Sequence, residues 1–207
     1  MSHNALAAPE TAPLPPTVAA AAEPGMHVGR AIAVSLELHG IDRVFTIPGE
    51  SYLAVLDGLR DSPIHNIVCR HEGGAAYMAD AYGRASSTVG VAMVTRGPGA
   101  ANAFVAIHTA WQDASPMVLF VGLIPTPDRD REAFQEFDPR AWFSTQTKRV
   151  LVLDSPERAR PCCYIHWRAA ERQIPAAYEL AVLSYRDASP RHCLTKLKHR
   201  SITLRPL

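Results

Sequence analysis

Short apolar runs alternate along this chain with segments of helical periodicity. Apolar residues recur at helical spacing over residues 28–36, and Gly40 follows as a typical helix C-terminal cap. Ser51 is expected to cap the helix after the first strand. Because strand and helix alternate with short connections, the pattern predicts an α/β fold, a doubly wound parallel sheet flanked by helices. The predicted strands are residues 43–47, 64–69, 89–95, 116–122 and 149–153.

This pattern is confined to residues 26–160, which we expect to form the folded domain. Residues 1–25 are rich in Ala and Pro without the basic start and apolar core of a secretory signal, so we interpret them as a disordered lead. Residues 161–207 have no glycine and no lasting periodicity, and we expect an irregular tail that does not continue the fold. Either this is a genuine tail with a basic end, or the reading frame departs from its ancestor near Pro161, which we favour.

Charge and composition narrow the class of partner. The net charge is +1 and 47% of residues are hydrophobic, which suits a small-molecule protein with a sizeable core. No basic face precedes the last fifty residues and no apolar run approaches about 20 residues, so we expect neither nucleic acid nor membrane as a partner. The four cysteines lack the spacing of a zinc site or a disulfide framework, which predicts no metal site and a reducing, cytoplasmic location.

Three glycine-containing segments follow predicted strands, at residues 48–50, 71–73 and 97–99. The carboxyl ends of parallel strands meet at one edge, where open α/β sheets bind ligands, so we expect these loops and Asn102 to outline one crevice. Glycine lets the backbone approach a ligand closely, and proline stiffens the loop. No Gly-x-Gly-x-x-Gly follows the first strand and no Gly-Lys-Ser/Thr occurs, which disfavours a dinucleotide or P-loop site.

Glu72 is the principal catalytic candidate, because it stands where a strand passes into a helix. Two glycines and two alanines follow it, leaving room for a flat, uncharged ligand and few polar groups to solvate the charge. This favours a nearly dry cleft. The alternative is that Glu72 only occupies the first turn of a helix, where the macrodipole favours an acid. His71 either assists or is structural.

Several motifs, taken together and in order, resemble the N-terminal, pyrimidine-binding domain of thiamine-diphosphate enzymes of the acetolactate synthase group. The resemblance covers about residues 26–160. The motifs are residues 45–50, 70–76, 81–84, 95–102 and 133–136.

The resemblance implies a role for each matching residue. The acid at Glu72 would hydrogen-bond the aminopyrimidine ring of thiamine diphosphate and promote its imino tautomer. Phe134 and Gln135 would border the substrate or flavin region. The residues that would lie against the pyrimidine are Pro48, Gly49, Gly97, Pro98 and Asn102.

The implied reaction is carboligation of 2-oxo acids, of the pyruvate to acetolactate type, in a homo-oligomer or with a longer thiamine-enzyme subunit. Magnesium, and FAD if it is bound, would belong to the full-length enzyme, because no Gly-Asp-Gly diphosphate motif occurs here. We therefore expect the isolated chain to bind the cofactor poorly and to be inactive.

The chain departs from the family pattern at two positions. Arg96 stands where family members often have Ser, and would hold an anion or form a salt bridge at the rim. Leu123 stands where they often have Gln, which weakens the case for flavin. Two other functions stay open: a non-catalytic module that pairs with a full-length thiamine enzyme, and a fragment of a related 2-oxo acid decarboxylase.

Overall fold

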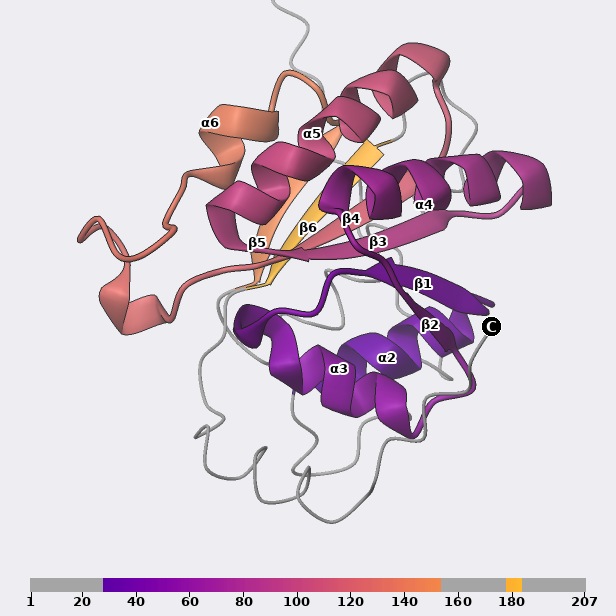
Figure 1. Cartoon of the computed structure of the whole chain (residues 1–207), viewed down its shortest axis with the longest axis horizontal. Coiled ribbons are helices and arrows are strands. Elements are labelled where there is room, and N and C mark those ends of the chain that lie inside the picture. The colour runs from indigo at the N-terminus through magenta and orange to yellow at the C-terminus, as the bar shows by residue number, and fades with distance from the viewer. Residues whose placement is uncertain (1–27, 154–177, 184–207) are drawn as a thin grey trace, which may run out of the picture.

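The computed structural model describes residues 28–153 and 178–183 (Figure 1). The expected lead at residues 1–25 lies outside the described residues. The helices are α2 Val28–Leu38, α3 Leu53–Arg60, α4 Glu72–Ser86, α5 Arg96–Asp113 and α6 Pro139–Phe143, with 3-10 turns η1 Glu50–Tyr52 and η2 Thr126–Asp128. The strands are β1 Arg43–Thr46, β2 His65–Val68, β3 Gly90–Thr95, β4 Met117–Gly122, β5 Arg149–Leu153 and β6 Tyr178–Leu183.

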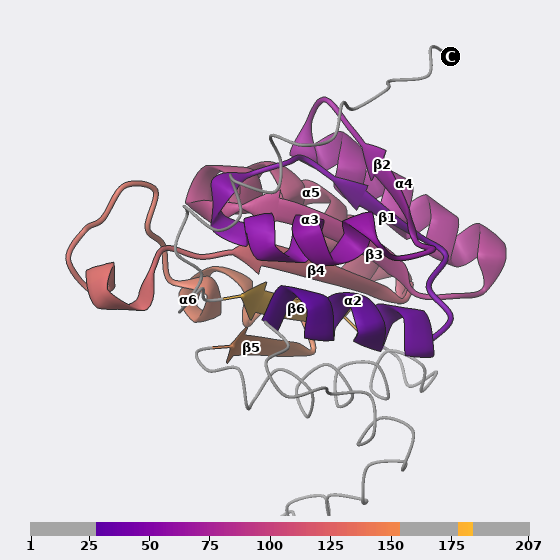
Figure 2. The same cartoon turned by 90° about the horizontal axis from the view of Figure 1, so that it is seen from below.

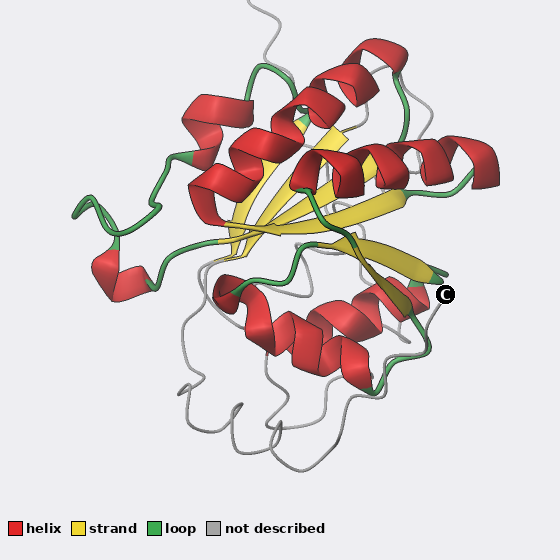
Figure 3. Cartoon of the chain, in the orientation of Figure 1, coloured by secondary structure: helices red, strands yellow, loops and turns green. Residues whose placement is uncertain are grey.

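The described strands form one six-stranded sheet in the order β2-β1-β3-β4-β6-β5. All neighbouring strands are parallel. Helices α4 and α5 cover one face and α2 and α3 the other, which gives three layers (Figures 2 and 3). The predicted doubly wound α/β fold is confirmed. The order of strands reverses between β1 and β3, and this switch point is where such sheets bind ligands.

Successive residues of β3 supply the two halves of the core, because side chains of a strand alternate between faces. Val91 and Met93 join the cluster that contains Ile32 of α2. Ala92 and Val94 join the cluster on the α4 and α5 side, where alanines are numerous. Small side chains let α4 and α5 lie close to the sheet, so the helix N-termini are held near the strand ends.

Two expectations from the sequence need correction. Strand β6 lies within residues 161–207, where we expected nothing to continue the fold, and it pairs with both β4 and β5. A strand between two others needs only a short apolar run, and the run at 180–183 is too short to reveal itself by periodicity. Ser51 caps no helix: it lies in η1, and Tyr52 is the residue before α3.

Among the described residues, none of the helices has both the length and the apolar character that crossing a membrane requires.

The C-terminal ends of α4 and α5 are tied together by a buried carboxylate. Asp80 accepts hydrogen bonds from Ser115 Oγ and from Arg84 Nε, the latter at 3.1 Å. Arg84 Nη2 also lies 2.7 Å from Asp80 Oδ2, and Arg84 Nη1 lies 2.6 Å from Asp113 Oδ2 on α5. Asp80 and Ser115 are buried, whereas Asp113 is exposed.

We expect Asp80→Ala to lower the free energy of unfolding by about 2 kcal/mol, because Ser115 and Arg84 lose their acceptor. Asp113→Ala removes only the exposed partner of Arg84, and should cost under about 1 kcal/mol. Urea unfolding of the two variants measures both values. Equal losses would show that burial of Asp80 adds nothing to the network.

Candidate functional site

Glu72 is the first residue of α4, directly after the loop that follows β2. The preceding residue, His71, is the N-cap, and its Nδ1 accepts a hydrogen bond from the Gly73 backbone N–H at 3.1 Å. His71 therefore has a structural role, one of the two alternatives from the sequence. The carboxylate of Glu72 also stands at the positive end of the α4 macrodipole, so the helix stabilises its charge.

Glu72 and Asn102 are joined across two helices. Asn102 lies in α5, after β3, and its Nδ2 donates to Glu72 Oε2 at 2.9 Å. Gly99 faces the same carboxylate: a Cβ there would lie 3.6 Å from Glu72 Oε1. The structure thus brings together residues that the sequence analysis assigned to one crevice from separate segments.

The cleft is wetter than expected. Glu72 is half-buried, and Asn102, Pro48 and Pro98 are exposed. These exposed neighbours do not form the nearly dry cleft that we expected, although Glu72 itself is partly shielded and lies close enough to buried Tyr52 to raise the pKa of that side chain. Glu72 keeps one oxygen in a hydrogen bond with Asn102 and stays partly accessible to solvent.

The Pro48–Gly49 loop is clamped to the end of β3. A Cβ at Gly49 would lie 2.4 Å from Thr95 Cβ, closer than real atoms approach. Ser51 Oγ and Thr95 Oγ1 are 2.5 Å apart and hydrogen-bonded. At the end of β4, Gly122 leaves room for Ser51, whose Oγ would be 2.1 Å from a Cβ at that position. The ends of β1, β3 and β4 are therefore locked to one another.

Tyr52 reinforces this lock from the core. Its hydroxyl donates to the backbone carbonyls of Ile47, after β1, and of Met93 in β3, the latter at 3.2 Å. The side chain is buried. Burial, and then the negative charge of Glu72, raise the pKa of Tyr52 well above its usual value, so it stays a neutral donor.

Gly97 and Pro98 lie in the first turn of α5 and not in a loop as expected. Proline is tolerated there because the first N–H groups of a helix have no intrahelical partner. Arg96 opens this turn with a φ of 47°, in the left-handed region. This conformation turns the chain sharply from β3 into α5 and brings Asn102 toward Glu72.

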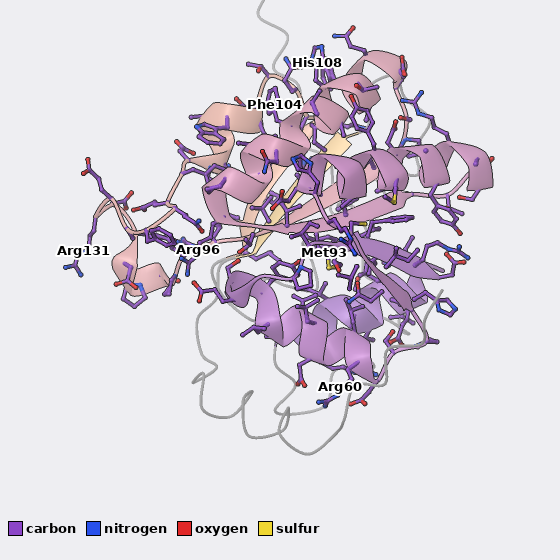
Figure 4. All side chains as sticks on the ribbon, viewed as in Figure 1. Arg60, Met93, Arg96, Phe104, His108 and Arg131 are labelled. Atoms are coloured by element: carbon purple, nitrogen blue, oxygen red, sulfur yellow. The ribbon has the colours of Figure 1, made fainter. Side chains whose placement is uncertain are left out.

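Phe134 and Gln135 lie beside this turn. The Gly97 N–H donates to the carbonyl of Gln135 at 3.0 Å. Phe134 is 76% exposed, and its ring lies under the Arg96 guanidinium, 5.9 Å from ring centroid to Cζ. The segment that carries these residues projects from the strand ends, close to Arg96 (Figure 4).

Arg96 connects the three segments. Its Nη2 lies 2.6 Å from Glu50 Oε1, and its Nη1 donates to the Phe134 carbonyl at 3.3 Å. The salt bridge at the rim, one of the two roles foreseen for Arg96, is confirmed. The sequence analysis missed Tyr52, Thr95 and the pairing of Ser51, because hydrogen bonds between separate segments leave no periodic signal.

Comparison with known proteins agrees with this geometry. Residues 26–142 match the family described as Thiamine pyrophosphate enzyme, N-terminal TPP binding domain. The chain is 39% identical over 132 residues to the probable acetolactate synthase large subunit of Methanocaldococcus jannaschii, a match that covers 64% of the chain and 22% of that relative.

Two further relatives give similar values. The catabolic acetolactate synthase of Raoultella terrigena is 36% identical over 151 residues, which cover 73% of the chain and 27% of the relative. The mitochondrial acetolactate synthase catalytic subunit of Saccharomyces cerevisiae is 40% identical over 134 residues, which cover 64% of the chain and 20% of the relative. The chain thus matches about a fifth to a quarter of the length of these relatives.

Proposed function

Because this chain belongs to the thiamine pyrophosphate enzymes through their N-terminal TPP-binding domain, we propose that its strand-end edge holds the pyrimidine end of thiamine diphosphate. The observation that carries this proposal is the hydrogen bond between Asn102 and Glu72, which fixes a carboxylate at the switch point of the sheet. A fixed carboxylate that faces a glycine suits a neutral heterocycle.

The residues present fit such a ring. Gly99 leaves the face beside the carboxylate without a side chain. Pro48 and Pro98 are exposed and rigid, so each would offer a flat apolar surface to a ring bound at this edge. Glu72 would share a proton with a ring nitrogen, while Asn102 keeps the carboxyl oriented. When bound, thiamine diphosphate supplies the electron sink that 2-oxo acid chemistry requires.

We propose carboligation of 2-oxo acids, of the acetolactate type, as the reaction in the intact enzyme. Phe134 and Gln135 would border the substrate, because both lie beside the first turn of α5. The relatives are about four to five times longer than the segment that this chain matches. We propose that the further parts of such an enzyme hold magnesium, which binds the diphosphate, and any flavin.

We further propose that a longer thiamine-enzyme subunit, or a second copy of the intact enzyme, covers the exposed part of the site. Partly exposed apolar side chains stand on the outer surface of the two helices that carry Glu72 and Asn102: Tyr77 and Met78 on α4 and Val105 on α5. An interface there would remove these side chains from water, and a partner that reaches the helix N-termini would shield Glu72 further.

A hybrid enzyme tests the proposed function. Residues 26–142 replace the matching segment of the Raoultella terrigena acetolactate synthase, which retains its own remaining parts. We expect the hybrid to form acetolactate from pyruvate and to need added thiamine diphosphate. A hybrid that assembles to the parental oligomer but makes no product would favour the non-catalytic pairing module, and release of acetaldehyde in place of acetolactate would favour the decarboxylase.

A further inference from the structure

A pocket of about 860 Å³ lies beside the proposed cofactor edge, between the end of β4 and the segment 129–140. Leu123, Ile124 and Val152 supply apolar wall, and Arg96, Arg129 and Arg140 also line it. A volume of this size is typical of small-molecule sites, in which a few polar groups fix an otherwise apolar contact.

Two guanidinium nitrogens at this pocket have no hydrogen-bond partner. They are Arg96 Nε and Arg129 Nη2. Among the described residues that are not exposed, these two are the buried side-chain nitrogen and oxygen atoms without a hydrogen-bond partner. Buried donors are nearly always paired, because an unpaired one loses its water without compensation. On a charged guanidinium the cost is greater, and an incoming anion relieves it with a charge-assisted hydrogen bond.

The acids on the pocket wall are largely occupied. Glu136 accepts from the backbone N–H groups of Asp130 and Ala133, at 2.7 and 2.9 Å, and these bonds hold its pKa below the usual value. Asp138 caps α6 through the N–H groups of Arg140 and Ala141. Glu132 and Asp130 are exposed. The lining thus carries four acids against three arginines, so an anion is favoured here by the two buried donors without a partner and not by an excess of positive charge.

The segment that covers the two nitrogens is able to yield. Asp130, Glu132 and Gln135 have φ values of 60°, 54° and 63°, in the left-handed region that non-glycine residues rarely adopt. Such positions store backbone strain. An anion that draws Arg96 Nε and Arg129 Nη2 toward it would therefore displace a covering segment whose backbone is already strained.

We propose that this pocket binds the oxyanion of a small molecule, a carboxylate or a phosphate group, through Arg96 and Arg129. The pocket adjoins the Glu72 edge, because Gln135 lines it and accepts a hydrogen bond from Gly97, but the proposed anion contacts need no thiamine diphosphate. The ligand's apolar part would lie against Leu123, Ile124 and Val152.

Titration of the full chain tests the proposal. The ¹⁵N-labelled protein is titrated with sodium pyruvate and, separately, with inorganic phosphate at constant ionic strength and pH, and amide shifts are followed by NMR. We expect saturable shifts in residues 123–140 with at least one anion. Arg129→Gln should raise the Kd about tenfold or more, because a charge-assisted donor is lost.

Arg131→Gln is the matched control. It removes the same charge from the same segment, but Arg131 is exposed and does not line the pocket, and Figure 4 shows it at the outer end of the projecting segment. Saturation by pyruvate alone assigns a carboxylate, by phosphate alone a phosphate group, and by both a general oxyanion site. No saturation with either anion, or equal weakening by Arg131→Gln, overturns the proposal.

Arg96→Gln provides a second test, with circular dichroism to check the fold because Arg96 also binds Glu50. If that variant unfolds, Arg129→Gln decides alone. Since the titrations contain no thiamine diphosphate, their failure leaves the proposed function untouched, and failure of the hybrid enzyme leaves the anion site untouched.

Discussion

Glu72→Gln is expected to lower the kcat of the hybrid acetolactate synthase by about 100-fold or more, the usual contribution of a positioned acid or base. The glutamine carbonyl still accepts the hydrogen bond that Asn102 donates to Glu72 Oε2 at 2.9 Å, so the geometry of the pair survives. What disappears is a group that can share a proton with the heterocycle. The loss therefore falls on turnover and not on folding.

Three measurements separate this role from a structural one. The kcat and KM for pyruvate come from steady-state assays of product, and thermal unfolding by circular dichroism reports the fold. Glu37→Gln makes the same chemical change on α2, on the opposite face of the sheet, and should leave kcat within about twofold. Unchanged turnover in Glu72→Gln would eliminate the proton-sharing role and leave the favourable helix dipole as the reason for the acid.

The half-buried state of Glu72 bears on the same experiment. A carboxylate works best in proton transfer when water is excluded, yet in this chain Glu72 stays partly accessible to solvent. We therefore expect the effect of Glu72→Gln to emerge in the hybrid, where a complete enzyme shields this position further, and not in the isolated chain.

The fold was predictable where apolar runs were long. Residues 89–95 and 116–122 are almost wholly apolar, as strands buried on both faces must be, and they became β3 and β4. The alternation with helices then restricted the topology to a parallel sheet. Strand β6 was missed because its apolar run is short and stands in a segment with no flanking periodicity.

The site was predictable as a neighbourhood but not as a set of contacts. Because the carboxyl ends of parallel strands meet at one edge, the sequence alone predicted that Glu72, Asn102 and Gly49 lie near one another. It said nothing of Tyr52, whose hydroxyl holds two carbonyls, because that contact depends on how the chain turns after β1. The shape of the Arg96 turn was hidden for the same reason: a positive φ at arginine has no sequence signature.

Gly49→Ala is expected to lower the free energy of unfolding by about 1–3 kcal/mol, the usual cost of forcing an extra methyl group into packed surroundings. The backbone at Gly49 is extended, with φ of −147° and ψ of 151°, so alanine adopts it without strain and the effect is purely steric. The new Cβ would lie 2.4 Å from Thr95 Cβ and 2.6 Å from Thr95 Oγ1. Thr95 cannot turn away cheaply because its hydroxyl is bonded to Ser51.

The consequence for the site is a displaced Pro48–Gly49 loop, so the hybrid enzyme with Gly49→Ala should also lose cofactor affinity. Gly74→Ala is the control, since nothing lies within 4 Å of a Cβ at this position in α4 and alanine favours the helix. Urea unfolding measures both, and it should find Gly74→Ala neutral or stabilising. Adding Thr95→Gly removes the atoms with which the new Cβ collides. The double variant should therefore be more stable than the sum of the two single-variant losses predicts. If Gly49→Ala proves as harmless as Gly74→Ala, or the double variant is simply additive, then the loop is not clamped to β3 and Pro48 has no fixed place beside Glu72.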